Sequence, residues 1–203
     1  IDSGVDCPEV SSFIGTDNYR AGIEAGKAAV ESVKNRQKIA VGLVNYDPNP
    51  DNGQQREAGV RDYLKTVPNA EIMAQVSVDT NLSSAISGVI TMLNNHPEIN
   101  VVIGFNEWTT LGVGYAIRQL GLSEKVASIG FDSNVVSIGM LETGEMDALV
   151  VQNPFAIGYL GVQRACLLLD GKKIERTLKT QTTVITKQNM FDTDNQKVLF
   201  PFK

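Results

Sequence analysis

Residues 38–44 read KIAVGLV, an almost uninterrupted apolar run that ends in the polar, proline-rich loop 45–52. A run of this length and composition is typical of a β-strand that is buried on both faces. An amphipathic segment, residues 55–64, follows the loop and places Val60 and Leu64 in one helical stripe. The stretch therefore predicts a strand, a polar loop and a helix in succession.

The same unit recurs further along the chain. Strands are predicted at 71–78, 100–105, 126–130 and 148–151, and helices at 81–94, 109–119 and 135–143. Two parallel strands need a crossover connection, and helices of this length supply one. The sequence therefore predicts an α/β fold with a parallel sheet flanked by helices. A further helix at 155–169 and a β-rich stretch at 181–186 fall outside this alternation.

Composition narrows the class of function. The 203 residues include 18 Lys and Arg against 23 Asp and Glu, and this net charge of −5 argues against a nucleic-acid partner. The chain has a single histidine and two cysteines. These are few residues from which to build a zinc site or a Ser-His-Asp triad. Phosphate-binding glycine motifs are absent, and no nucleophile and base stand at plausible spacing. We therefore expect no metal, no cofactor and no enzymatic activity.

Polar residues follow each predicted strand, where ligands bind in open parallel sheets. They are Asn45–Asp47 with Arg56 on the next helix, Asp79–Asn81, Asn106–Trp108, Asp132–Asn134, and Gln152 with Asn153. Amide groups together with one guanidinium and one carboxylate suit a ligand with many hydroxyls, because each hydroxyl both donates and accepts. The sequence thus predicts a binding site for a small polyhydroxylated molecule.

Each of these residues also has a structural explanation. Asp79, Asn81 and Asp132 could be helix N-caps, for which Asp and Asn are favoured. Arg56 could be a solvated helix residue paired with an acidic neighbour. Trp108 could fill a gap between helix and sheet. Only the convergence of several such residues on one sheet edge favours a binding site.

Five short motifs follow one another along the chain: SFIGTDNYRAG (12–22), VIGFNE (102–107), IGFD (129–132), VQNP (151–154) and VITKQN (184–189). In this order they resemble the type I periplasmic sugar-binding proteins. The chain is most similar to the ribose-binding branch, which shares its fold with the effector-binding cores of LacI-type repressors. The resemblance implies two lobes, joined by three crossing segments, that close on a sugar.

The resemblance assigns roles to individual residues. Arg56 falls on an arginine that contacts sugar hydroxyls, and Asn106 falls on the asparagine after the central strand. Asp132 matches the carboxylate of the Gly-Phe-Asp motif, and Gln152 matches the hinge glutamine. These four residues are the expected core of the ligand site.

The resemblance also assigns three further residues to the site, and two of these three depart from the family pattern. Asp2 matches the aspartate of an Asp-Arg pair that ends a strand of the first lobe, whereas Ser3 replaces the arginine. Thr80 stands where relatives place a Phe or Trp that stacks on the sugar ring. Trp108 is the candidate for a replacement ring, although we rank packing above that role.

The resemblance also implies a domain organisation. Residues 16–152 and 186–203 would form a nearly complete C-terminal lobe, and residues 1–15 and 153–185 would be remnants of an N-terminal lobe. With most of that lobe absent from the chain, the predicted helix at 155–169 and the strand near Val184 would expose apolar surface. We therefore expect the chain to self-associate or to be mobile there.

The implied function is that of the solute-binding protein of an ABC importer. Its partners would be a sugar-like ligand and a membrane permease, and its location periplasmic or extracellular and membrane-anchored. Two alternatives share the same pocket. One is the effector core of a LacI-type repressor, and the other is a periplasmic sensor domain of a signalling system.

Overall fold

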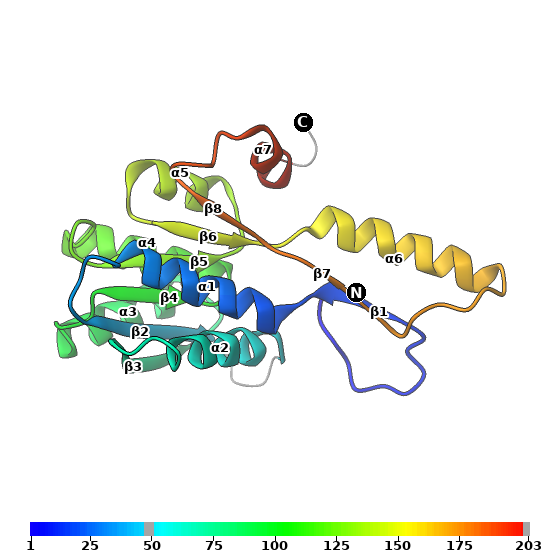
Figure 1. The fold of residues 1–203 in the computed structure, drawn as a ribbon, viewed down its shortest axis with the longest axis horizontal. Helices are drawn as coiled ribbons and strands as arrows, with labels where there is room; N and C mark the ends of the chain where they lie inside the picture. Colours follow the sequence, from blue (N-terminus) through cyan, green and yellow to red (C-terminus); the bar gives the residue numbers. More distant parts are fainter. Residues whose placement is uncertain (47–50, 201–203) are drawn as a thin grey trace.

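The computed structural model describes residues 1–46 and 51–200. Figure 1 shows a broad sheet with helices on both faces, continued on one side by a narrow extension that carries α6, β1 and β7. Asp47, one of the polar residues predicted at a strand end, lies outside the described residues, as do residues 201–203 of the C-terminal tail.

The central part of the chain alternates strands and helices as predicted. Its elements are β2 (Ile39–Tyr46), α2 (Asp51–Leu64), β3 (Ala70–Val78), α3 (Leu82–Asn95), β4 (Val101–Gly104), α4 (Glu107–Leu120), β5 (Ala127–Phe131), α5 (Val135–Thr143) and β6 (Ala148–Val151). Together with β8 (Thr183–Thr186) they form a six-stranded sheet in the order β3-β2-β4-β5-β6-β8. All pairs are parallel except the antiparallel pair of β6 and β8. The predicted α/β fold is confirmed.

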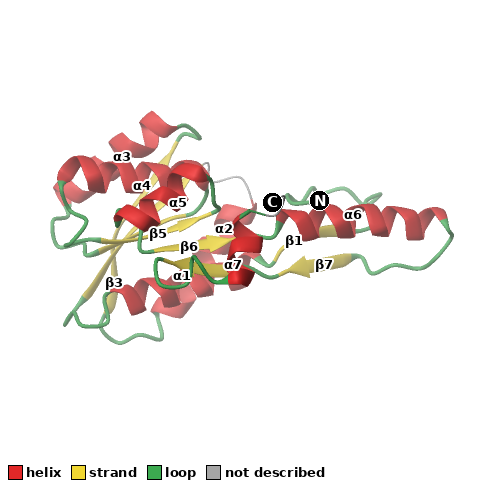
Figure 2. Cartoon of the chain, turned by 90° about the horizontal axis from the view of Figure 1, so that it is seen from above, coloured by secondary structure: helices red, strands yellow, loops and turns green. Residues whose placement is uncertain are grey.

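Helices cover both faces of this sheet (Figure 2). The helix α1 (Asn18–Ser32) packs with α2 against one face, while α3, α4 and α5 lie on the other. Every residue of β2 is buried as a result, which explains why residues 39–44 are apolar without alternation. The carboxyl ends of the parallel strands point toward β1, β7 and α6 (Figure 1).

A second, two-stranded sheet stands outside the larger one. It pairs β1 (Phe13–Thr16) in parallel with β7 (Thr177–Thr180), and α6 (Pro154–Leu169) contacts β1. Residues 1–12 form no strand. The strand β7 and the short helix α7 (Thr193–Leu199) were not predicted, because their short polar sequences have no clear period.

The position of β8 corrects one boundary of the predicted domains. Residues up to 185 were expected in the remnant of an N-terminal lobe, but Val184 pairs with Val150 and Ile185 with Leu149 in the larger sheet. Ile185 is fully buried against α5 and α7, which fixes β8 there. Residues 183–185 therefore lie with the larger sheet, and the chain changes sheets between β7 and β8.

An ion pair holds the end of α5 against α4. Arg118 Nε donates to Glu145 Oε1 over 2.7 Å, and this bond holds the pKa of the Glu145 carboxyl below its ordinary value. A lowered pKa in the folded state means that the stabilisation is complete above pH 4.5 and is lost as the pH falls through the folded pKa.

We expect Glu145→Gln to lower the free energy of unfolding by about 1 kcal/mol at pH 7. The difference from wild type should shrink from pH 7 toward pH 3, because protonation of Glu145 begins to remove its charge while Arg118 stays charged. Urea denaturation at the two pH values measures it. Glu142→Gln, which changes an exposed carboxylate in the last turn of α5, is the matched control. An equal loss at both pH values would show that the ion pair is not the cause.

Candidate ligand-binding site

Arg56, on α2, contacts residues of α1, of β5 and of the segment that follows β4. Only 3% of this residue is exposed. Its Nε donates to Asn18 Oδ1 over 2.9 Å and its Nη1 to the carbonyl oxygen of Phe105 over 2.7 Å. The guanidinium carbon lies 4.6 Å from the centre of the Phe131 ring, a cation–π contact. The explanation of Arg56 as a solvated surface residue is therefore wrong.

Two glycines allow Arg56 to be buried in this way. A Cβ atom on Gly22 of α1 would lie 2.0 Å from the carbonyl oxygen of Arg56, and one on Gly59 of α2 would lie 2.1 Å from the carbonyl oxygen of Tyr19. Only glycine permits backbones to approach so closely. The contact between α1 and α2 thus fixes the position of Arg56, which is not among the residues that line the cavity described below.

Gln152 connects Asp132 to the narrow extension. Its Nε2 donates to Asp132 Oδ1, and its Oε1 accepts from the hydroxyl of Thr16 in β1 over 2.6 Å. Asp132 has a left-handed backbone with a φ of 66°, which residues other than glycine seldom adopt. Because Asn134, not Asp132, caps α5, the N-cap explanation of Asp132 is wrong.

Three of the predicted site residues line one cavity of about 370 Å³. Asp2, Asp132 and Gln152 supply its polar wall together with Ser133. Its apolar wall consists of Val151, Pro154, Ile157, Val198 and Leu199. The cavity lies where β6 ends, next to the first turn of α6 and to α7. It has the mixed lining typical of small-molecule sites.

Tyr46 belongs to the strand-end stretch 45–47 but was not among the predicted ligand residues. It ends β2, is buried, and donates its hydroxyl to Asn52 Oδ1 over 2.8 Å. Burial raises its pKa, the charge of Arg56 lowers it, and the carboxylates of Asp132 and Asp2 raise it further. Tyr46 thus lies within electrostatic reach of all three charges. The sequence signal that points to Tyr46 is its position at the end of a strand, where ligands bind in parallel sheets.

Asn106 and Asn81 both cap helices. The Oδ1 of Asn106 accepts from the backbone N–H of Thr109 over 2.9 Å in a capping box at the start of α4. Among the described residues its Nδ2 has no protein acceptor, so it is available to a ligand. Asn81 caps α3 through Ser84, so the structural explanation is confirmed for Asn81.

The remaining candidates lie at the edge of the site. Thr80 is exposed beyond β3, the edge strand, and does not line the cavity. Ser3 is also exposed and donates to Asp2 Oδ2 over 3.4 Å. Trp108 is 41% exposed in the first turn of α4, so the packing role ranked first for it is wrong.

A larger cavity, of about 560 Å³, lies at the opposite, amino-terminal edge of the sheet, where Arg36, His96 and Lys125 line it. None of the predicted site residues contacts it. Across the described chain, no three His, Cys, Asp or Glu side chains are grouped as metal ligands. Within residues 1–46 and 51–200, no helix has both the length and the apolar composition to cross a membrane.

Known proteins resemble this chain in sequence and in fold. The chain is 24% identical over 188 residues to the ribose import binding protein of Bacillus subtilis, a match that covers 93% of this chain and 60% of the relative. A carbohydrate transporter solute-binding protein of Agrobacterium radiobacter, solved with D-arabinose, superimposes with a TM-score of 0.93 at 31% identity. That match covers 98% of this chain and 68% of the other.

A second solved structure is a solute-binding protein of an ABC transporter from Agrobacterium vitis, bound to α-D-tagatopyranose. It matches at 26% identity with a TM-score of 0.89 and covers 93% of this chain and 63% of its own length. The chain spans 60% of the length of the first curated relative. Residues 1–173 match the family described as a periplasmic binding protein domain. The resemblance predicted from the five motifs is thus confirmed, and the chain belongs to the periplasmic binding protein domain family.

Proposed function

We propose that this protein binds a small polyhydroxylated ligand, a sugar or a close relative of one, at the carboxyl edge of its larger sheet. The observation that carries the proposal is the meeting of Asp2, Asp132 and Gln152 on one cavity. The amide of Asn106, which follows β4, and the buried cation of Arg56 on α2 support it. Such groups bind hydroxyls by charge-assisted hydrogen bonds and need no chemical step.

The narrow extension is proposed to belong to a second lobe that closes over the ligand. Residues 1–15 and 153–182 carry β1, β7 and α6, and of α6 only Ile157 is buried. The larger sheet and its helices, residues 16–152 with the tail from 183, form the first half of the cleft. A hinge at the junction of the two parts is supported by the hydrogen bond between Thr16 and Gln152.

Transport is the role that the relatives support best. The Bacillus subtilis relative is named as an import binding protein, and the Agrobacterium proteins are named as transporter components. We therefore propose delivery of the ligand to the membrane permease of an ABC importer, with the protein in the periplasm or anchored outside the membrane. A repressor core and a sensor domain would use the same cavity, but none of these relatives is named as one.

Titration of the full-length gene product against sugars and polyols tests the proposal. We expect Asp132→Asn to weaken binding by about 10- to 100-fold, since a hydrogen bond to a buried charge contributes about 1.5–3 kcal/mol. Asparagine keeps the acceptor for Gln152, so the fold should persist. Trp108, the only tryptophan of the chain, provides a fluorescence signal beside Asn106.

Asp79→Asn is the control for this experiment, because Asp79 also follows a strand but lies outside the cavity. It should bind as wild type does. Equal affinities of wild type and Asp132→Asn would contradict the assignment of the site. Failure of every sugar and polyol to bind would contradict the function itself.

A further inference from the structure

The cavity at the amino-terminal edge of the larger sheet is separate from the proposed sugar site. Its volume is about 560 Å³, which is within the range of small-molecule sites. All of its lining residues fall between residues 36 and 126, so the larger sheet and its helices form it without the narrow extension. The extension lies at the opposite end of the molecule (Figure 1), and closure of a second lobe there would leave this cavity accessible.

The floor of this cavity is apolar and is part of the protein core. Leu93, Ile99 and Val126 line it and are buried in the hydrophobic cluster that α3 and α4 form with the sheet. Leu120 and Leu122 also line it and pack against the same cluster. An apolar group placed on this floor is stabilised in proportion to the apolar surface that it removes from water.

Two cations line the same cavity without a protein partner. Arg36 comes from the segment between α1 and β2, and Lys125 comes from the segment between α4 and β5. Within residues 1–46 and 51–200, no carboxylate forms an ion pair with either of them. Among the described lining residues, Glu98 supplies the single carboxylate, and its Oε1 lies 3.2 Å from Nδ1 of His96. Its own backbone N–H and the His96 ring hold the pKa of Glu98 below its ordinary value.

Basic side chains also stabilise helix C-termini, and α3 and α4 both end at this edge of the sheet. Backbone groups cap these two ends. The N–H of His96 donates to the carbonyl oxygen of Met92 over 2.9 Å in α3, and the N–H of Leu122 donates to that of Ile117 over 3.0 Å in α4. Neither of the two unpaired cations donates a side-chain hydrogen bond to these helix ends, so both charges remain available to a ligand.

We propose that this cavity is a second ligand site, for a small molecule with an apolar body and one anionic group, such as an alkanoate. The apolar body lies on the floor, and the anionic group binds the cations of Arg36 and Lys125. A guanidinium and an ammonium both form charge-assisted hydrogen bonds with a carboxylate. The inference goes beyond the function proposed above, because none of the residues expected to bind the sugar lines this cavity.

Calorimetric titration of the full-length gene product with octanoate, octanol, octylamine and acetate tests the proposal. Octanoate should bind about tenfold more tightly than octanol, because only octanoate uses both the floor and the two cations. Octylamine should bind more weakly than octanol, and acetate, which lacks the apolar body, should not bind measurably. The advantage of octanoate should decrease as salt is raised from about 0.05 to about 0.5 M. No binding of octanoate, or equal binding of octanoate and octanol, would overturn the inference.

Two double variants test the role of the two cations. Arg36→Gln, Lys125→Gln should reduce the affinity for octanoate to that for octanol and leave octanol binding unchanged. Lys173→Gln, Arg176→Gln removes the same charges at exposed positions outside the cavity, and should keep the advantage of octanoate. An unchanged advantage in the first variant, or an equal loss in both, would overturn the inference.

Proton–nitrogen correlation spectra locate the bound octanoate. We expect the largest shifts of amide signals in residues 93–100 and 120–126, which contain most of the lining residues. Shifts confined to the residues around Asp132 and Gln152 would place octanoate in the proposed sugar site and overturn the inference. The readout is independent of sugar binding, so failure of every sugar and polyol to bind would contradict only the function proposed above.

Discussion

Replacement of Arg56 by alanine is expected to abolish ligand binding and to lower the free energy of unfolding by about 3 kcal/mol or more. The change leaves Asn18 Oδ1 and the Phe105 carbonyl oxygen without donors, and each unsatisfied buried acceptor costs about 1–3 kcal/mol. It also removes the contact with the Phe131 ring. Urea denaturation measures the loss of stability, and sugar titration measures the loss of binding.

Two further variants separate the effects of charge and of shape. Arg56→Lys keeps the positive charge, but a single ammonium cannot reproduce the fork that reaches both acceptors. It should fold with an intermediate loss of stability and bind at least tenfold more weakly. Arg20→Ala removes an exposed arginine of α1 and should change stability by less than about 0.5 kcal/mol. An Arg56→Ala protein within 1 kcal/mol of wild type would contradict this view of the site.

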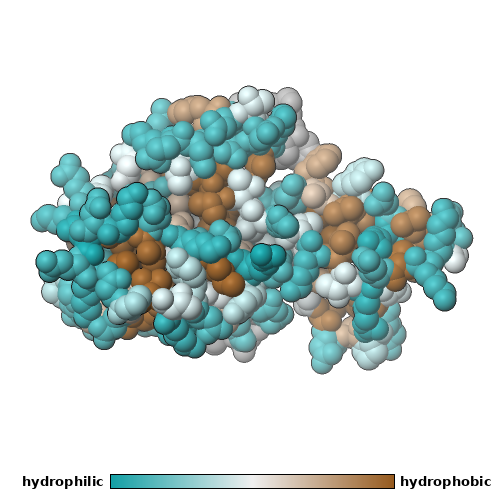
Figure 3. Space-filling view, viewed as in Figure 1, coloured by the Kyte–Doolittle hydropathy of each residue, from teal (hydrophilic) through white to brown (hydrophobic). Residues whose placement is uncertain are grey.

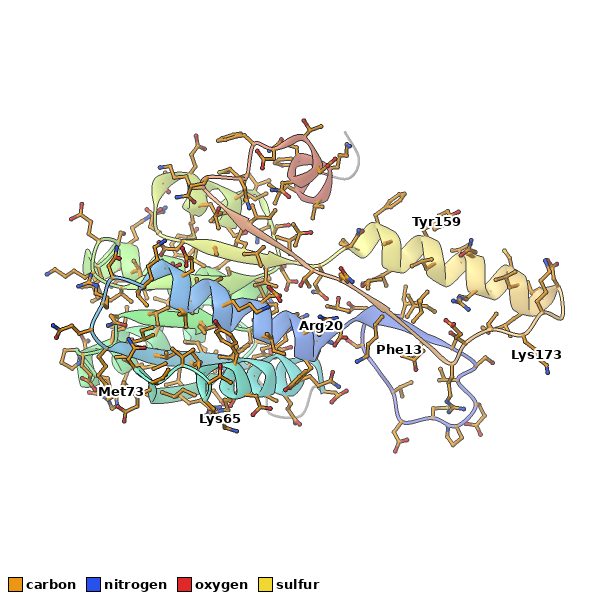
Figure 4. The ribbon with its side chains drawn as sticks, viewed as in Figure 1. Phe13, Arg20, Lys65, Met73, Tyr159 and Lys173 are labelled. Atoms are coloured by element: carbon orange, nitrogen blue, oxygen red, sulfur yellow. The ribbon has the colours of Figure 1, made fainter. Side chains whose placement is uncertain are left out.

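The 203-residue chain is expected to self-associate through α6. Along this helix Phe155, Tyr159, Val162 and Leu169 are 54%, 61%, 68% and 88% exposed. Figure 3 shows hydrophobic residues at the surface of the extension that carries α6, and Figure 4 shows Tyr159 on the outer side of the helix. A contiguous apolar surface of this kind is seldom left in contact with water. A second copy of the chain can cover it with the same helix, in a two-fold arrangement.

Size-exclusion chromatography with light scattering measures this association. We expect dimers or larger species at micromolar concentration, and we expect the double variant Val162→Lys, Leu169→Lys to shift the chain to monomer. Phe191→Lys, which replaces a 70% exposed residue next to α7, should leave the association unchanged. A wild-type monomer in which the amides of residues 153–185 are strongly protected from hydrogen exchange would contradict the prediction. It would show that α6 is buried against the rest of its own chain.

Much of the fold was predictable because its signals are local. The apolar run 38–44 became β2, and the helix predicted at 135–143 became α5 with the same bounds. Gly121 and Gly144 end α4 and α5 with φ values of 64° and 89°, as their places in the sequence indicate. The strand β7 was missed because four residues without alternation carry no local signal.

The candidate site was predictable only in part. The strand-end rule and the family motifs identified Asp2, Asp132 and Gln152, which the fold does bring to one cavity. The same rule also included Thr80, which lies exposed beyond the edge strand. The position of a strand-end residue along the sheet depends on the strand order. The sequence of a single strand–helix unit does not determine that order.

The sequence by itself determined the alternation of elements, because strand burial and helical periodicity are encoded within about ten residues. Only the tertiary structure decided that Arg56 is buried, since that depends on the approach of Gly22 on another helix. It likewise decided that Trp108 is exposed and that Tyr46 lies within reach of the charges of Arg56, Asp2 and Asp132. Burial and electrostatic reach are properties of surfaces that meet across long sequence separations, so no local pattern specifies them.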